Sequence, residues 1–333
     1  MNSIVEMQTK MAALFGPSGH EKQVATFIQE YAKPFSSEIS TDAMGNLIIR
    51  KKGNGKRIML TAHMDSLGVL ITRVEGTGYL RFCSIGATRF INNYFGALMV
   101  FNNGTKGFVF GETSSDSSKV NSSLYMDIGA SSEDEAKSLV KVGDAAVFQA
   151  NTYVQNGKIF STYLDNRIGC VALMVALSRL EECKNDVYLV FSTQEEVGFR
   201  GIKSAAQRIN PDYSITVDVT SSTDIPCESN GNSELGKGAA IKLADCSALC
   251  NRDFIDRIEG IASANNIAHQ LDIMYNGTET GAIQQIGLGT VVGGISIPTR
   301  YIHNAIEVAN ISDIEASIDL IVKTVCQISD SIA

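Results

Sequence analysis

The apolar positions near the N-terminus follow the period of an α-helix. In the segment SGHEKQVATFIQEYAKPF, Val24, Phe27 and Ile28 recur at the spacing that places side chains on one helix face. Ser18 is followed three residues later by Glu21, which is the pattern of a capping box. We therefore predict an amphipathic helix that opens with this box.

Runs of branched and aromatic residues predict strands that alternate with further helices. The segment GNLIIRKKGNGKRIMLTAH reads as two strands joined by a glycine-rich turn, the second covering residues 57 to 61. VYLVFST, YSITVDVT and TVVGGISIP read as buried strands, and DNRIGCVALMVALSRLEEC and NRDFIDRIEGIASANN as helices. The closing helix, ISDIEASIDLIVKTVCQIS, has a second predicted capping box at Ser312 and Glu315. This alternation predicts an α/β fold with a mixed central sheet and helices on both faces.

The pattern changes between residues 72 and 157. Short strand-like runs such as GYLRFCSI, ALMVFN and KGFVFGE are separated by clusters of Gly, Asn and Ser, and SSEDEAKSLV suggests one short helix. We interpret 72–157 as a small, mostly β domain that serves assembly and is inserted into a catalytic domain formed by 1–71 and 158–333. The alternative is that the insert is only a lid.

Composition describes a folded globular protein and excludes several partners. The chain has 333 residues, of which 44% are apolar, and a formal charge of −8 with a pI near 5.1. Its Lys and Arg residues are scattered, so neither nucleic acid nor an anionic membrane is an expected partner. We see no signal peptide and no stretch long enough to span a bilayer, and we predict a cytoplasmic protein. The seven cysteines form no CxxC pair, which favours reduced core thiols.

Polar residues that a buried core does not need follow several predicted strands. They are His63 and Asp65 after RIMLTA, Glu195 and Glu196 after VYLVFSTQ, Asp218 in YSITVDVT, His303 after TVVGGISIPTRYI, and Asp165 ahead of a long apolar helix. In open α/β sheets, ligands collect beyond the carboxyl ends of the strands, so these side chains can converge. Two of only four histidines in the chain, together with several carboxylates, point to a metal site.

Taken singly, each carboxylate has a simpler interpretation. Asp165 alone is an N-cap, Glu195 and Glu196 alone are a solvated strand end, and Asp218 alone is a turn residue. Only their combination with the two histidines favours a metal site.

These stretches together resemble metallopeptidase family 42, the two-metal aminopeptidases that include tetrahedral, glutamyl and deblocking enzymes, some of them named glucanases. The resemblance runs through nearly the whole chain. It is carried by GPSGHE, DAMGNL, TAHMDSLG, YMDIGA, VKVGDAAVF, YLDNRIGC, STQEEVGFRG, VDVT, LGKGAAI, GTETGAIQ and ISIPTRYIHNAIEV.

The resemblance implies that five residues bind two divalent metal ions per chain. The implied ligands are His63, Asp165, Glu196, Asp218 and His303, with Asp165 shared by both ions. It also implies that Asp65 orients His63 and that Glu195 is the general base. The chemistry agrees, because a carboxylate can bridge two cations and mixed nitrogen and oxygen ligands suit Zn²⁺, with Co²⁺ or Mn²⁺ as alternatives. Because side chains alternate in an extended segment, Glu195 and Glu196 should face different ways and do different work.

The implied activity is removal of N-terminal residues from peptides by a metal-bridging water that Glu195 activates. The expected partner is a peptide with a free N-terminus. One alternative is a glycoside hydrolase, which the absence of Trp and an aromatic content of 7% disfavour. The other is a non-catalytic assembly protein, which should have lost a ligand or the base, yet all seven positions are intact.

The chain departs from the family at a few positions. Asn166 and Glu279 stand where the family often has Asp, Ser66 where it has Glu, and NA at 304–305 replaces a usual Ser-Pro. The resemblance also implies a cis peptide bond between Asp165 and Asn166. In relatives the inserted domain builds dimers and then tetrahedral dodecamers, so we expect a homo-oligomer. Its order stays open, because GETSSDSSKVNSS lacks the family's usual Pro- and His-containing segment.

Overall fold

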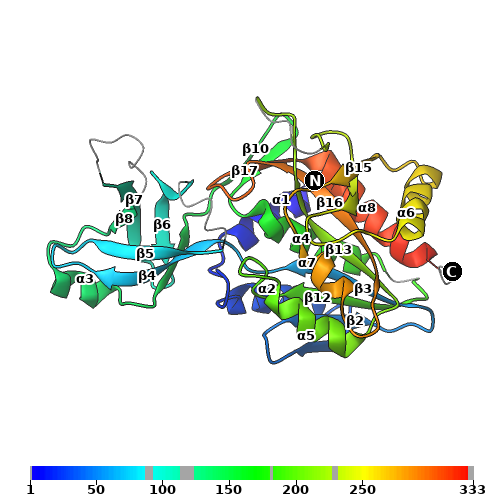
Figure 1. The fold of residues 1–333 in the computed structure, drawn as a ribbon, viewed down its shortest axis with the longest axis horizontal. Helices are drawn as coiled ribbons and strands as arrows, with labels where there is room; N and C mark the ends of the chain where they lie inside the picture. Colours follow the sequence, from blue (N-terminus) through cyan, green and yellow to red (C-terminus); the bar gives the residue numbers. More distant parts are fainter. Residues whose placement is uncertain (1, 87–92, 113–123, 181–182, 227–231, 329–333) are drawn as a thin grey trace.

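The structure is a computed structural model that describes residues 2–86, 93–112, 124–180, 183–226 and 232–328. Figure 1 shows two parts side by side: a small β barrel at the left and a larger α/β part at the right. Most of the segment GETSSDSSKVNSS, residues 113–123, lies outside the described residues. Within them, no helix is both long enough and apolar enough to cross a membrane.

The larger part is built on a mixed sheet, as predicted. Across the sheet its strands follow one another in the order β1 (Glu38–Thr41), β2 (Leu47–Lys51), β12 (Asp186–Ser192), β3 (Arg57–His63), β13 (Tyr213–Ser221), β16 (Val291–Arg300), β17 (Glu307–Asn310), β11 (Lys158–Ser161) and β10 (Thr152–Gln155). Two further strands lie off this path: β14 (Ala239–Ala244) pairs with β16 and with β15 (His269–Ile273). The central strands β12, β3, β13 and β16 are parallel. Although β2 and β3 are adjacent in sequence, β12 lies between them.

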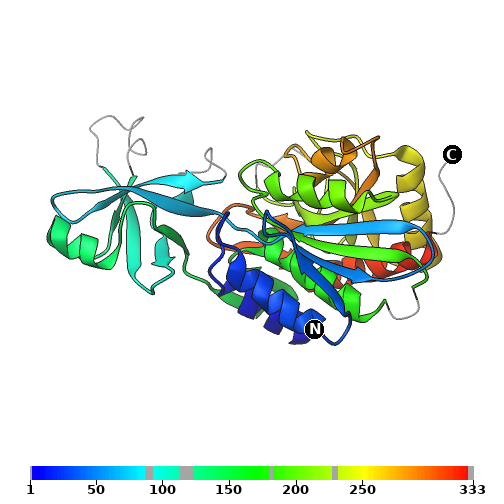
Figure 2. The same ribbon diagram turned by 90° about the horizontal axis from the view of Figure 1, so that it is seen from below.

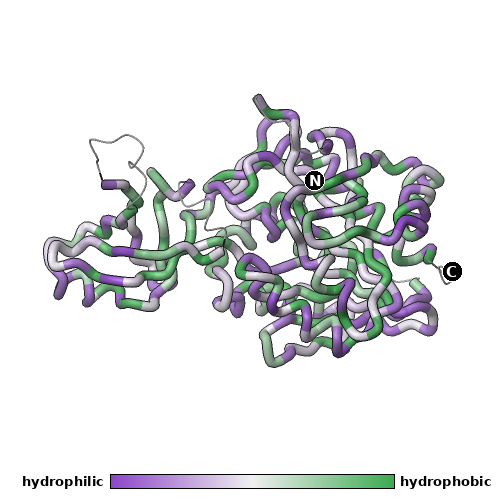
Figure 3. The backbone as a smooth tube through the Cα atoms, in the orientation of Figure 1, coloured by the Kyte–Doolittle hydropathy of each residue, from purple (hydrophilic) through white to green (hydrophobic). Residues whose placement is uncertain are grey.

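Helices cover both faces of this sheet. One face carries α1 (Asn2–Ala12), α2 (Lys22–Ala32), α4 (Leu164–Ser178), α6 (Arg252–Ala264) and α8 (Ile311–Gln327), and the other carries α5 (Arg200–Ile209) and α7 (Glu279–Gln284). Figure 2 shows the sheet between these layers. In Figure 3 the hydrophobic segments run through the interior of this part, and many hydrophilic segments lie on its outer rim. Burial of these apolar faces is the main source of stability for such a layered fold.

The capping box predicted for the first of these amphipathic helices does not form. Helix α2 has Glu21 at its N-cap, with no side-chain cap. The Ser18 hydroxyl instead donates to Asp65 at 2.6 Å, and the Glu21 carboxylate accepts from the backbone N–H of Gln194 at 3.1 Å. Both side chains are therefore used in contacts with segments that lie far away in the sequence.

The second predicted capping box is also wrong. Helix α8 has Asn310 at its N-cap, and this side chain accepts from the N–H of Ser312 at 3.0 Å. The helix therefore begins earlier than the Ser312 and Glu315 pattern indicates.

The small part is a closed barrel. Its strands are β4 (Gly68–Val74), β5 (Leu80–Ile85), β8 (Leu124–Asp127), β7 (Lys106–Gly111), β6 (Leu98–Phe101) and β9 (Ala145–Phe148). Helix α3 (Glu133–Leu139) is the short helix that SSEDEAKSLV predicts. The barrel strands thus span residues 68–148, and the following strands β10 and β11 belong to the large sheet.

The core of the barrel reaches the start of α4. Tyr163 at the N-cap of this helix is buried with the barrel residues. Its hydroxyl accepts from the N–H of Phe148 at 2.6 Å, and the two rings lie 6.0 Å apart. The last barrel strand therefore contacts the segment that carries Asp165.

Candidate metal centre

Strands β3 and β13 diverge at their carboxyl ends. Their parallel pairing stops at Thr61 and Thr216, whereas β3 continues beside β12 to His63 and β13 continues beside β16 to Ser221. Such divergence between parallel strands leaves room for a ligand at the edge of the sheet.

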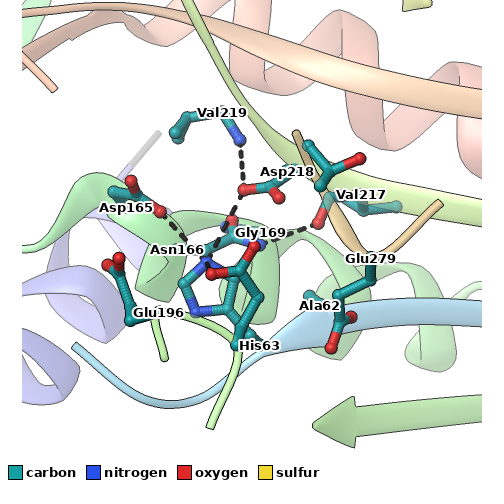
Figure 4. Close-up of polar contacts among 12 residues, drawn as sticks. Ala62, His63, Asp165, Asn166, Gly169, Glu196, Val217, Asp218, Val219 and Glu279 are labelled. Carbon is teal, nitrogen blue, oxygen red and sulfur yellow. Dashed lines mark hydrogen bonds and ion pairs between the residues drawn. The ribbon is translucent and has the colours of Figure 1, made fainter. Parts of the chain in front are cut away.

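The start of helix α4 lies against this divergence. The peptide bond between Asp165 and Asn166 is cis, which confirms the expectation drawn from the resemblance. The side chain of Asn166 donates to the carbonyl of Val217 at 2.9 Å and accepts from the N–H of Gly169 at 3.2 Å. These hydrogen bonds attach the first turn of α4 to β13, so that Asp165 lies beside the side chains of β3 and β13 (Figure 4).

The structure brings the five implied ligands together in two groups. His63, Asp165 and Asp218 form one group, and Asp165, Glu196 and His303 form the other; within each group the candidate ligand atoms lie within 4.8 Å of one another. Asp165 belongs to both groups, so its two oxygens can serve two sites.

The shared carboxylate lies between the two imidazoles. His63 Nε2 is 3.1 Å from Asp165 Oδ1, and His303 Nε2 is 3.2 Å from Asp165 Oδ2. His63 Nε2 is also 3.8 Å from Asp218 Oδ1, and His303 Nε2 is 3.5 Å from Glu196 Oε2. Each imidazole therefore faces one oxygen of the shared carboxylate and one further carboxylate.

Asp65 contacts more of the site than orientation of His63 alone requires. Its carboxylate Oδ1 lies 3.5 Å from His63 Nδ1, and its backbone oxygen lies 3.2 Å from the same nitrogen. Its two carboxylate oxygens also accept from the N–H groups of Glu195 at 3.0 Å and Glu196 at 3.2 Å. Asp65 thus connects β3 to the turn that carries both glutamates.

Glu195 and Glu196 differ in surroundings, but not through strand alternation. Strand β12 ends at Ser192, and Gln194 has a φ of 55°, so the two glutamates follow a left-handed residue in a turn. Glu195 Oε2 lies 4.0 Å from His63 Nε2, while Glu196 faces His303. The separation of roles predicted for them therefore rests on a turn and not on a pleated strand.

A further carboxylate, Glu307, supports both groups and is missing from the sequence-based set. Its Oε2 accepts from the N–H of Asp165 and its Oε1 from the N–H of His303, both at 2.9 Å. Glu307 is 2% exposed. The signal was present in YIHNAIEV, where an acidic residue follows His303 at the edge of an apolar strand.

Burial and the clustered charges together raise the pKa values of carboxyl groups and imidazoles in this site. Burial raises the pKa of Glu195 well above its usual range and that of Asp218 to about 7. Burial lowers the pKa of His303, but nearby carboxylates, Glu196 first, outweigh it and raise that pKa to about 11. The pKa of His63 is raised in the same way, against burial, by the charge of Glu195 first. Protons and cations therefore compete for the same atoms.

The residues present fit divalent cations. Glu196 Oε1 is buried and has no hydrogen-bond partner among the described residues, which is costly for a carboxylate oxygen unless a cation binds it. Imidazole nitrogens together with carboxylate oxygens are the donors that Zn²⁺ and similar ions accept. His63, Asp165 and Asp218 would hold one ion, and Asp165, Glu196 and His303 the other.

A cavity of about 340 Å³ opens over these side chains. Its floor contains all five implied ligands and Glu195, and its walls come from residues 198–199, 219, 246, 274–278 and 302. The cluster is therefore accessible to a small molecule or to a chain end.

Two of the positions that depart from the family lie close to the cluster. Besides Asn166, Glu279 at the start of α7 is buried and accepts from the hydroxyl of Thr61 at 2.7 Å. Its carboxylate lies to the right of His63 in Figure 4 and outside both ligand groups.

Comparison with known proteins gives a consistent result. The family model for the M42 glutamyl aminopeptidases matches residues 45–320. A proposed aminopeptidase of Acetivibrio thermocellus is 39% identical over 326 residues, covering 96% of this chain and 98% of that protein. A lysyl aminopeptidase of Pyrococcus furiosus is 30% identical, covering 95% of this chain and 94% of that protein.

Solved structures agree with this assignment. An aminopeptidase from Desulfurococcus kamchatkensis is 31% identical with a TM-score of 0.93, covering 98% of this chain and 96% of that one. A TET peptidase of Pyrococcus horikoshii, which can assemble into a tetrahedron or a large octahedral shell, is 31% identical with a TM-score of 0.86, covering 98% of this chain and 100% of that one. A Thermotoga maritima protein with the name endoglucanase is 27% identical with a TM-score of 0.81, covering 97% and 96%. The resemblance seen in the sequence motifs is confirmed, and the chain belongs to the M42 glutamyl aminopeptidase family of peptide hydrolases.

Proposed function

We propose that the protein is a metal-dependent aminopeptidase that removes residues one at a time from the N-terminus of peptides. The observation that carries this proposal is the pair of ligand groups joined by Asp165 at the floor of an open cavity, with Glu195 beside them. Membership of the family supports it.

Each residue has a proposed part in the reaction. When bound, two divalent ions would polarise the scissile carbonyl and make a water molecule more acidic. Glu195 accepts a proton from the water that attacks the carbonyl carbon, and it returns that proton to the nitrogen as the C–N bond breaks. The raised pKa of Glu195 fits a group that must hold a proton for part of the cycle. Asp65 keeps the His63 ring and the turn with Glu195 in place.

The glycosidase and assembly-protein alternatives are weaker. A glycosidase needs two carboxylates across a sugar-binding groove and no imidazole ligands, whereas here two histidines face the shared carboxylate. The name endoglucanase on one related structure is the reason to test this alternative. A protein that only assembles would not need the ligands and the base together in one accessible cavity.

The decisive experiment combines metal exchange with a substrate panel. Protein stripped with a chelator and reloaded with Zn²⁺, Co²⁺ or Mn²⁺ is assayed on aminoacyl chromogenic amides and, in parallel, on soluble glucans. The proposal expects amide hydrolysis that disappears on stripping and returns on reloading. Glucan cleavage that survives the chelator would support the glycosidase instead, and silence on both substrates with metal bound would contradict the proposal.

We also propose that the protein is a homo-oligomer whose building block is a dimer. Six such dimers can assemble into a tetrahedral dodecamer. The related TET peptidase forms closed shells. In this chain the barrel exposes Phe95, Phe108 and Phe110, whose rings lie 5.2 to 6.2 Å apart in succession. Clustered exposed aromatic side chains are typical of protein interfaces.

A further inference from the structure

We infer that the site accepts an uncharged apolar side chain, such as leucine or methionine, as the first residue of its substrate. This inference rests on the proposed aminopeptidase function and adds the class of residue that is removed. Family membership does not decide the question, because the family is described as glutamyl aminopeptidases while one relative carries the name lysyl aminopeptidase.

The first argument is the lining of the cavity away from its floor. The ligands and Glu195 would contact the free amino group and the scissile bond, so the side chain of the first residue must occupy the remaining volume. Among the described residues that line this volume, none is Asp, Glu, Lys, Arg or His, and Phe199, Val219, Met274 and Ile302 supply apolar surface. An apolar side chain gains free energy by leaving water for such a surface.

The cation of Lys242 lies behind the wall and not inside the cavity. The side chains of Lys242 and Asp245 are both fully buried, with Nζ 3.4 Å from Oδ2. Lys242 Nζ is also 3.3 Å from the hydroxyl of Thr278 and 4.0 Å from the sulfur of Met274, two residues that line the cavity. Since this ammonium is buried behind the wall, none of the described residues that line the remaining volume offers an exposed cation to an acidic substrate side chain.

The carboxylate of Asp245, behind the same wall, also has its hydrogen-bond partners within the protein. Asp245 Oδ2 accepts from the hydroxyl of Thr278 at 2.6 Å. Its Oδ1 accepts from the N–H groups of Ser247 and Ala248 and from the hydroxyl of Ser247, at 2.6 to 2.9 Å. A basic side chain of the substrate would therefore find no available carboxylate among the described residues of this wall. A charge that enters without a partner loses its hydration and gains nothing in return.

Phe199 packs closely against Gly277 in the wall. A Cβ atom added to Gly277 would lie 3.3 Å from Phe199 Cζ and 3.2 Å from Cys246 Sγ, so the absence of a side chain at Gly277 lets ring and thiol approach. The backbone of Phe199 is left-handed, with a φ of 54°, at the N-cap of α5. Asn and Asp adopt this conformation more readily than most residues, and both serve as N-caps. Position 199 can therefore take a carboxylate or its neutral amide with the same backbone.

The first test is a specificity profile of the metal-loaded enzyme. We expect kcat/KM for leucine and methionine p-nitroanilides to exceed that for the glutamate and lysine p-nitroanilides on the order of 10²-fold. Turnover led by glutamate or lysine would overturn this inference and leave the proposed function standing. Silence with every amide would overturn the proposed function, and this inference with it.

The second test compares Phe199→Asp with Phe199→Asn. Both variants lose apolar surface, so both should lose activity on the leucine amide. Only Phe199→Asp adds a charge to the wall, and we expect it alone to raise the ratio of lysine to leucine kcat/KM, on the order of tenfold. Equal ratios in two variants that melt at the same temperature would mean that position 199 does not face the bound side chain, and would overturn the inference.

Discussion

At the scale of single residues, the turn after β12 gives two neighbouring carboxylates different surroundings. Glu195 lies near His63, and Glu196 lies near His303 and keeps one oxygen without a hydrogen-bond partner among the described residues. The same substitution at these two adjacent positions should therefore have different effects on the enzyme.

Replacement of each glutamate by its amide tests this difference. Glu195→Gln should retain bound metal and lose on the order of 10²-fold or more in kcat, because the proton acceptor is gone. Glu196→Gln should instead lose metal, because an amide oxygen is a weaker ligand than a carboxylate. Metal content by mass spectrometry and kcat on a chromogenic amide separate the two effects. If metal content fell in Glu195→Gln and not in Glu196→Gln, the roles would be exchanged.

Metal uptake should be coupled to proton release. The pKa of His303 is raised to about 11 and that of His63 well above its usual value, so both imidazoles are protonated near neutral pH before a cation binds. A cation needs neutral imidazole, so loading must displace these protons, and affinity should rise with pH by up to about tenfold per unit for each proton. Calorimetric titration of stripped protein with Zn²⁺ in two buffers of different ionisation enthalpy measures the release. Equal heats in both buffers would contradict the prediction.

At the scale of elements, the N-cap of helix α8 differs from the residue that the sequence pattern favours. Asn310 caps the helix, and Ser312, which the sequence pattern favours, lies inside the first turn. Asn310 is also the last residue of β17, so the strand and the helix meet directly without a loop.

The stability of this junction should depend on the side chain at position 310. Asn310→Ala removes the acceptor for the N–H of Ser312 and should lower the free energy of unfolding by about 1 kcal/mol. Asn310→Asp keeps an acceptor at the helix N-terminus and should be close to neutral. Denaturant unfolding of the two variants makes the comparison, and a similar loss in both would show that the cap is not the cause.

Local patterns in the sequence predict most elements and, with the family motifs, indicate the same five candidate ligands that the structure groups at one edge of the sheet. They do not predict the strand order, because β12 enters between β2 and β3 from far along the chain. The capping box predicted at Ser18 does not form for a related reason. The Ser18 hydroxyl donates to Asp65, a contact that exists only in the folded protein. Glu307 was missed because its hydrogen bonds reach the backbone of two ligands, and no side-chain pattern records such bonds.

At the scale of the whole molecule, the barrel extends away from the α/β part and is joined to it near the candidate metal centre (Figure 1). Its exposed Phe108 and Phe110 lie on the same face of β7, two residues apart. This face is the surface through which we propose that copies of the chain associate.

Charged residues on this face should reduce the size of the assembly. Phe108→Lys combined with Phe110→Lys should lower the mass measured by light scattering, because buried lysines at an interface lose their hydration. Leu139→Lys, an exposed apolar position on α3 of the same barrel, is the matched control and should keep the mass. An unchanged mass in the double variant would place the interface elsewhere.

The ligand groups draw on β3, the start of α4, the turn after β12, β13 and the connection between β16 and β17, from His63 to His303. While the chain is being synthesised, a ribosome-bound intermediate that lacks the last of these segments has only one complete group. It also lacks Glu307, which supports the backbone of Asp165. Under the proposed function, an unfinished copy would therefore be inactive itself, and its activity would begin only when its own synthesis is almost complete.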